Sequence, residues 1–240
     1  AENFMFALDE GNVTISLAGV NEALVISSFR LTPYESYISY ADYLEKYKDE
    51  KQGTSVVKLE SEYASSTSSN TVYAVEDRTS AATSPADPSR TLLNTIGGEQ
   101  WQNAGQFITY KFRVDNSGLY NIDARYRQNT LEGLYVCRNL YIYSDGLEEG
   151  AKGYYNGIPF AEATELRFRY DSAWQTGHLS NGTDALQFYF EAGVTYTIRL
   201  EVTLGSMSEI IRSMEAALTA LDADYLTILK LTGPSPDTYR

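Results

Sequence analysis

Hydrophobic and polar residues alternate along most of the chain, which is the pattern of β-strands with one buried face. Residues 4–31 contain two or three such runs, with a turn at Asp9–Asn12. Many short strands separated by turns are typical of a β-sandwich or jelly roll, so the expected fold class is mainly all-β. Later runs, bounded mostly by Gly, Asn or Asp, predict strands at 56–62, 107–114, 118–127, 136–143, 165–170, 185–191 and 196–204.

Two segments show helical spacing instead. Ser39 stands as an N-cap before apolar residues that recur at helical intervals in 40–47, which predicts a short helix and then a polar linker through Gly53. Near the end, an apolar stripe over residues 210–221 predicts a second helix. The following segment, 224–231, is predicted as a closing strand that the Pro-rich tail ends.

A long loop is predicted between the early strands. Residues 64–90 are rich in Ser, Thr, Ala and Pro and have little periodicity. Loops of this length in a compact domain are usually functional or mobile, and a solvated surface excursion is the open alternative.

Two hairpins of similar sequence, Phe6–Leu17 and Phe188–Leu200, indicate two related β-units. A full set of strands precedes the second hairpin, whereas almost nothing precedes the first. The first therefore belongs to a preceding domain or adds strands to the main one. The expected organisation is strands of a preceding or partly included β-domain (1–32), a helix and linker (33–54), a jelly-roll β-sandwich domain (55–232) and a tail (233–240).

Net charge and the lengths of apolar stretches argue against some classes of partner. The chain has 19 basic and 32 acidic residues and a formal net charge of −13, so a nucleic-acid partner is not expected, because phosphate contacts need clustered Lys and Arg. No stretch approaches the roughly 20 apolar residues of a spanning helix. The abundance of Tyr, Ser, Thr, Asn and Gly favours an extracellular protein.

The sequence offers few groups for catalysis. The single Cys137 permits no internal disulfide, and the single His178 lacks a flanking catalytic signature, so it is interpreted as a loop histidine. A Gly-rich phosphate loop and a nucleophile elbow are missing from the sequence. A pair of carboxylates could still serve a glycosidase or lyase, which would need a deep cleft with two facing acids. The chain is expected not to be an enzyme.

Two other sets of residues could bind ligands. Glu60 and Glu62, at i and i+2 of a predicted strand, share one face, which suits either a Ca²⁺ site or an ordinary polar strand face. Trp101 and Trp174 lie in polar, turn-rich surroundings. Exposed indoles stack on the apolar faces of sugars, and an indole tucked under a loop is the alternative.

Four segments carry a resemblance to a known family. Leu59–Ala64 resembles the Leu-Glu-Ala-Glu-x-Ala opening of family 6 and family 35 carbohydrate-binding modules. Trp101 with Gly105–Tyr110, the strand Gly118–Arg127 and the hairpin Leu186–Leu200 resemble further segments of the same modules, in the same order. The resemblance implies a galactose-binding-like jelly roll and non-catalytic sugar recognition.

The resemblance also implies ligands for a structural calcium ion. In the family, Ca²⁺ is held by the two Glu of the opening motif and an Asp of the last strand. The matching residues here are Glu60, Glu62 and Asp224. Trp174 falls near an aromatic residue of the family's ligand loop.

A narrower resemblance is to β-sandwich domains attached to extracellular solute-binding proteins of bacterial sugar ABC transporters. Arg125–Gln128, Arg138–Ile142, Ile158–Phe160 and Leu200–Gly205 have close counterparts there. It implies an accessory part of a longer protein at the bacterial cell surface, with a neighbouring domain of that chain as a partner.

The expected function is therefore a non-catalytic carbohydrate-binding domain of a bacterial extracellular protein, accessory to a sugar-transport solute-binding protein. Trp101 and Trp174 are the predicted stacking platforms, and Arg127 and Asn129 are the predicted partners of sugar hydroxyls. The alternative is a structural or interaction scaffold that binds no sugar, marked by an apolar patch and two buried Trp.

Overall fold

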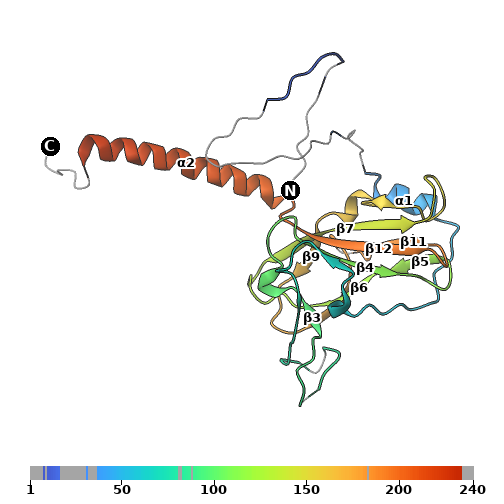
Figure 1. Ribbon diagram of the computed structural model, residues 1–240. Coiled ribbons are helices and arrows are strands. Elements are labelled where there is room, and N and C mark those ends of the chain that lie inside the picture. The colour runs from blue at the N-terminus through green and yellow to red at the C-terminus, as the bar shows by residue number, and fades with distance from the viewer. Residues whose placement is uncertain are drawn as a thin grey trace.

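The structure is a computed structural model, and it describes residues 8, 10–16, 31, 37–80, 83–87, 89–182 and 184–233. In this part of the chain the fold is mainly β, with antiparallel strand pairs, two α-helices and three short 3-10 helices. The predicted all-β class is confirmed. Figure 1 shows the strands gathered into one body, with α2 (Met207–Thr232) extending away from it.

The largest sheet has the strand order β1-β4-β12-β7-β8, and β9 also pairs with β7. Its strands are β1 (Ser66–Thr67), β4 (Phe107–Phe112), β7 (Tyr135–Asp145), β8 (Asn156–Gly157), β9 (Leu166–Arg169) and β12 (Thr195–Thr203). In the centre, Ile198 of β12 lies opposite Tyr110 of β4 and Ile142 of β7. The sheet confirms the predicted strands at 107–114, 136–143, 165–170 and 196–204.

Three smaller sheets have two strands each. They pair β5 (Gly118–Asn121) with β11 (Gln187–Phe190), β6 (Asp123–Tyr126) with β10 (Gln175–His178), and β2 (Ala74–Val75) with β3 (Thr95–Ile96). The predicted strands at 118–127 and 185–191 are confirmed, although the first is divided at Ile122 into β5 and β6. The predicted loop over 64–90 contains β1 and β2.

Aromatic side chains fill the core between these strands. Phe188 and Phe190 of β11 and Tyr196 of β12 are at most 1% exposed. The rings of Phe190 and Tyr196 lie 4.8 Å apart, centroid to centroid. Each such side chain contributes roughly 1.5–3 kcal/mol by leaving water, which explains why the alternating runs of the sequence form strands here.

The helix predicted at 40–47 is confirmed as α1 (Tyr40–Lys46). Ser39 caps it, because its Oγ accepts a hydrogen bond from the backbone N–H of Asp42 at 3.2 Å. Tyr43 is buried, and its hydroxyl accepts from the backbone N–H of Tyr189 at 2.8 Å and bonds the Tyr155 hydroxyl. Burial raises the pKa of Tyr43 well above its usual range. α1 is thus packed into the same body as the strands.

The linker after α1 also joins this body. Gly53 N–H donates to the Leu119 carbonyl at 2.8 Å, and Leu119 N–H donates to the Lys51 carbonyl at 2.9 Å. Gly118 has φ of 159°, and a Cβ there would lie 2.7 Å from the Gly53 nitrogen. Only a glycine allows the linker to approach β5 this closely.

The predicted strand at 56–62 is wrong. Ser61–Tyr63 form a 3-10 helix, and residues 54–60 have no strand pairing in the structure. The alternation of this segment has no buried face, since Val56 is 95% exposed and Leu59 is 38% exposed. The apolar periodicity of this segment therefore predicted a strand, although no strand of the described residues pairs with it.

The predicted closing strand at 224–231 is also wrong, because the helix predicted at 210–221 continues through Thr232. Tyr225 and Ile228 continue the helical spacing of Leu218 and Leu221, and Gly233 with φ of 72° ends the helix. In the described part of the chain no helix is long and apolar enough to cross a membrane.

The predicted strands in residues 4–31 fall mostly outside the described residues. The described stretch 10–16 has a bend at Glu10 and Gly11 and no strand. Residues 234–240 of the predicted tail also lie outside the described part.

Candidate functional site

The structure brings two of the four predicted ligand residues together. Arg127 directly follows β6 and Trp174 directly precedes β10, and these strands pair with Tyr126 opposite Gln175. The two side chains therefore meet where the pairing ends. The Arg127 guanidinium carbon lies 5.1 Å from the centroid of the Trp174 ring, within cation–π range.

A third segment supplies the partner of Arg127. Its Nη2 donates to Oδ2 of Asp77 at 2.5 Å, and its Nη1 donates to the Thr79 hydroxyl at 2.5 Å. The side chains of Arg127 and Asp77 are 20% and 9% exposed, so this ion pair is shielded from much of the solvent. The charge-assisted bond to the carboxylate and the second bond to Thr79 together fix the plane of the guanidinium. Arg127 is therefore held in one orientation beside Trp174.

Asp77 is charged in this setting. Burial by itself raises the pKa of Asp77, but hydrogen bonds from the Thr79 hydroxyl and backbone N–H and the positive charge of Arg127 outweigh burial and hold that pKa below its ordinary value. The Thr79 N–H donates to Oδ1 at 2.7 Å. The carboxylate is therefore fully engaged by groups of the protein.

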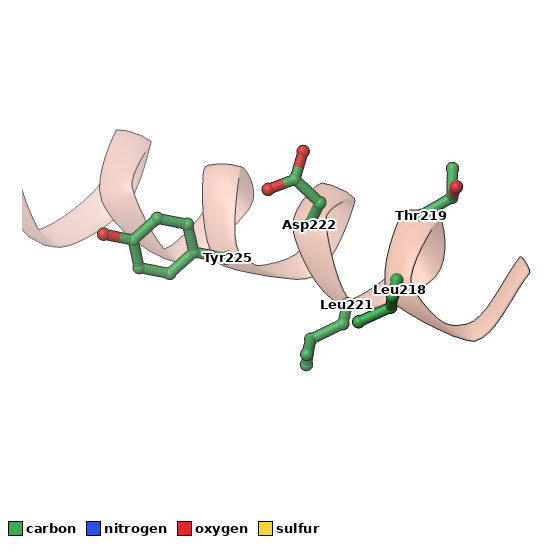
Figure 2. Close-up of a pocket in the computed structure, with 5 residues that line it drawn as sticks. All are labelled: Leu218, Thr219, Leu221, Asp222 and Tyr225. Carbon is green, nitrogen blue, oxygen red and sulfur yellow. The ribbon is translucent and has the colours of Figure 1, made fainter. Parts of the chain in front are cut away.

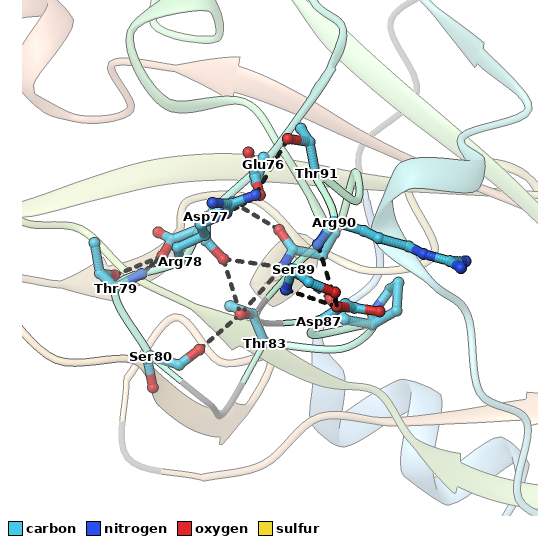
Figure 3. A network of polar contacts seen from close by, with 12 residues as sticks. Glu76, Asp77, Arg78, Thr79, Ser80, Thr83, Asp87, Ser89, Arg90 and Thr91 are labelled. Carbon is cyan, nitrogen blue, oxygen red and sulfur yellow. Dashed lines mark hydrogen bonds and ion pairs between the residues drawn. The ribbon is translucent and has the colours of Figure 1, made fainter.

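The buried Asn94 holds the loop that carries Asp77. Its Oδ1 accepts from the Asp77 N–H at 2.8 Å, and its Nδ2 donates to the carbonyls of Asp77 at 2.9 Å and Pro85 at 3.0 Å and to the Thr83 hydroxyl at 3.2 Å. Figure 3 shows further contacts among the polar side chains of this loop, including Asp87, whose carboxylate accepts from Ser89. The central part of the predicted long loop is thus fixed by one amide.

The indole of Trp174 is partly buried. Its Nε1 is inaccessible to solvent and has no hydrogen-bond partner among the described residues. An unpartnered buried donor costs roughly 1–3 kcal/mol. The indole N–H of Trp174 therefore lacks the hydrogen bond that the polar groups around it have.

Asn129 lies two residues after Arg127 and is exposed. The buried Gln128 between them shapes the turn, because its Oε1 accepts from the backbone N–H groups of Thr130 at 2.9 Å and Leu131 at 3.0 Å. The Asn129 amide is therefore presented at the surface beside Arg127 in the chain.

Trp101 belongs to a different environment. The Arg138 guanidinium carbon lies 4.2 Å from the centroid of its ring, and its Nε1 donates to the Gln106 carbonyl at 3.2 Å. Arg138 is 9% exposed and donates from Nη2 to the Trp101 carbonyl at 3.0 Å. Burial lowers the pKa of Arg138 to about 10. One face of Trp101 is thus covered, and the ring packs against the core.

The three predicted calcium ligands are not brought together. No group of three or more acidic, His or Cys residues among the described residues is arranged to hold a metal ion. Asp224 lies exposed on α2 rather than on a closing strand, and Glu60 forms an ion pair with Lys58. Glu62 has one buried carboxylate oxygen without a partner among the described residues. Calcium binding stays a prediction, and Asp224 cannot join the two Glu in this arrangement.

His178 lies on β10 and forms a hydrogen-bonded pair with Asp123 on β6, where both side chains are 54% exposed.

Two surface hollows lie away from the Arg127–Trp174 pair. One is next to α1 and residues 154–159, and the other runs along α2, lined by Leu218, Thr219, Leu221, Asp222 and Tyr225 (Figure 2).

Some residues of this site could not be predicted from the sequence. The sequence analysis missed three of them. Asp77 and Asn94 have partners far along the chain. The hydrogen bonds of Gln128 depend on how its turn closes. The buried position of Arg138 could have been predicted. It is a charged residue within the apolar run of β7, and a buried charge needs hydrogen-bond partners inside the protein.

No protein-family model matches the chain, and no curated protein matches it. Among solved structures, the chain is similar to a cycloisomaltooligosaccharide glucanotransferase of Paenibacillus sp. in complex with cycloisomaltoheptaose, at 19% identity over 70% of this chain. The matched region makes up 21% of that enzyme, with a TM-score of 0.40. A likeness this weak carries no argument about this chain.

Proposed function

We propose that this chain is a non-catalytic carbohydrate-binding domain whose sugar site is centred on Trp174 and Arg127. The observation that carries the proposal is the convergence of an indole, a guanidinium and a carboxylate from three separate segments at one end of the β6–β10 pair. Sugar sites combine an aromatic ring for the C–H face with a few fixed polar groups for the hydroxyls.

Each residue has a role in this site. Trp174, which is partly exposed, provides the stacking ring. Asp77 and Thr79 engage two of the five N–H donors of the Arg127 guanidinium, which orients the others. Asn129 adds an exposed amide nearby in the chain. Trp101 packs against the core and its N–H has a carbonyl acceptor, so it supports the fold in this proposal rather than the ligand.

The resemblance to modules attached to solute-binding proteins supports a proposal about where the chain acts and what it assists. In that reading the chain is extracellular, lies at the bacterial cell surface and assists sugar capture for transport. The site residues are on loops that the core holds in place, which is where binding residues of β-sandwiches are commonly found.

The test is a thermal-shift series of the chain with a panel of plant and host oligosaccharides, because a ligand that binds only the native state raises Tm. We expect at least one glycan to raise Tm, and Trp174→Ala to abolish the rise. Tyr63→Ala is the matched control, since Tyr63 is an aromatic residue with 76% exposure that takes no part in the site. A Tm rise that survives in Trp174→Ala would contradict the proposal, as would the absence of any response.

The second candidate function is a structural scaffold that binds no sugar. The observation that favours it is the row of exposed apolar residues on α2, because surfaces of this kind usually contact other proteins. If the folded, unaltered chain responds to no glycan, the conclusion shifts to this candidate.

A further inference from the structure

α2 presents an apolar face that the described part of the chain does not bury. The helix starts after the short connection 204–206 that follows β12, and its 26 residues extend for about 39 Å at 1.5 Å per residue. None of its residues is buried. Leu218, Leu221 and Tyr225 are 61%, 64% and 56% exposed. In Figure 2, Leu221 points away from Thr219 and Asp222, so the apolar and polar sides are distinct.

Seven apolar residues of α2 follow a heptad pattern. Successive spacings alternate between four and three residues without a break. This period of 3.5 residues is that of a coiled-coil seam, in which two helices wrap around each other and bury positions a and d. The seam consists of Met207, Ile211, Met214, Leu218, Leu221, Tyr225 and Ile228.

We propose that α2 pairs in antiparallel orientation with α2 of a second copy of this chain. The seam is symmetric about the helix centre, so antiparallel pairing places Leu218 opposite Leu221 of the second copy at two equivalent positions. On either side, Met214 meets Tyr225 of the second copy and Ile211 meets Ile228. Each layer therefore joins an a position to a d position, as antiparallel coiled coils require.

Residues beside the seam favour the antiparallel over the parallel orientation. In the antiparallel pair, Ile210 and Leu231, which are 58% and 82% exposed, lie opposite each other. In a parallel pair, Ile210 would instead face Glu215, and Leu229 would face Asp224. The antiparallel arrangement brings Glu215 near Asp222 of the second copy, which costs less than exposing the apolar pair because surface charges are screened.

The position of the β body agrees with this orientation. The connection 204–206 keeps the body against the start of α2 (Figure 1). Antiparallel pairing separates the two bodies by about the length of the helix, whereas parallel pairing would bring both to the same end. A lipid surface is a poorer partner, because α2 has four acidic and two basic residues and polybasic faces are what anionic membranes attract.

The first test is the mass of the chain in solution by sedimentation equilibrium at about 100 μM, which would populate a dimer of micromolar Kd. We expect twice the chain mass of 26.8 kDa. The double variant Leu218→Asp with Leu221→Asp should be monomeric. The control, Ala216→Asp with Ala223→Asp, adds the same charge on the opposite face of α2 and should stay dimeric. Circular dichroism confirms that each variant keeps its fold.

The second test fixes the orientation by disulfide cross-linking. We expect no cross-link in Ile211→Cys alone and a cross-linked dimer when Ile211→Cys is mixed with Ile228→Cys. The unmodified chain is the background control, since Cys137 is buried. A cross-linked dimer of Ile211→Cys alone would overturn the antiparallel pairing. A monomeric chain would overturn the pairing altogether, including a monomer that instead binds phosphatidylcholine–phosphatidylglycerol vesicles. This inference is independent of the sugar site, because its readout is mass and not glycan binding.

Discussion

The loop cluster around Arg127 and the helix α2 differ in how far the protein satisfies its own groups. At the loop cluster, Asp77 bonds Thr79, Asn94 and Arg127. The Thr79 hydroxyl also accepts from Arg127, and only Trp174 in this cluster keeps a buried donor without a partner among the described residues. On α2 the described part of the chain leaves most of an apolar face exposed. In our two proposals, the rigid cluster therefore binds a polar ligand and the α2 face binds a second apolar surface.

The two tryptophans show the same contrast on a smaller scale. Each lies near an Arg, but the N–H of Trp101 has a carbonyl acceptor and that of Trp174 has none among the described residues. Buried donors without a partner are rare in folded proteins, so the Trp174 indole is the one of the two that calls for an explanation.

The largest expected effect is a difference in the free energy of unfolding between a core substitution and a substitution on α2. Leu140→Ala should lower the free energy of unfolding by about 2–5 kcal/mol, because Leu140 is 0% exposed and its loss leaves a cavity. Leu221→Ala on α2 should change it by roughly 0.5 kcal/mol or less at concentrations where the chain is monomeric. Urea unfolding of both variants measures the difference. Equal losses would show that the α2 face is covered within one chain.

Removal of the Asn94 amide should produce the next effect. Asn94→Ala should cost about 2–3 kcal/mol, since it leaves buried partners such as the Asp77 N–H without a bond. Asn129→Ala, at an exposed position in the same region, is the control and should change stability by less than about 0.5 kcal/mol. Chemical denaturation measures the free energy of unfolding of both variants. Similar losses in the two variants would contradict the claim that Asn94 holds the loop in place.

Arg127→Lys should have a smaller effect on stability, about 1 kcal/mol, because an ammonium cannot reproduce the two-atom contact with Asp77 and Thr79 or the stacking on Trp174. The same change should weaken glycan binding. Arg125→Lys, on the neighbouring strand β6, is the matched control. If both variants bind glycan as the unaltered chain does, Arg127 is no part of the site.

The smallest effect concerns acid pH. The pKa of Asp77 is lower in the folded protein than its ordinary value, so its contribution to stability is present above the unfolded-state pKa and is lost as pH falls through the folded-state pKa. Asp77→Asn should therefore reduce the loss of stability that the unaltered chain shows on acidification. Thermal unfolding from neutral to acid pH measures this, and parallel curves for the two proteins would contradict it.

The strands were predictable where their alternation coincides with burial. Tyr196, Ile198 and Val202 of β12 all face the core, and the sequence pattern identifies them. The pattern failed at 56–62, where Val56 is exposed and no strand among the described residues pairs with the segment. It also failed at 224–231, where helical spacing competes with apparent alternation. Burial is a property of the assembled fold, so local periodicity alone could not decide these two segments.

The candidate site was predictable in part. The sequence predicted Trp174, in a polar turn, and Arg127 as ligand residues, and the β6–β10 pairing places these two side by side. Asp77 was hidden among the many acidic residues, since only the closure of its loop places it against Arg127. Glu60, Glu62 and Asp224 were grouped by resemblance, and the continuation of α2 separates Asp224 from the opening motif.

The central claim is that Trp174, and not Trp101, faces the ligand. The chain has two tryptophans, so an ¹H–¹⁵N spectrum of the labelled protein contains two indole N–H signals, which Trp174→Phe assigns. On titration with a glycan that raises Tm, we predict that the Trp174 signal shifts with saturation while the Trp101 signal stays in place. A shift of the Trp101 signal alone, or of neither signal, would contradict the account.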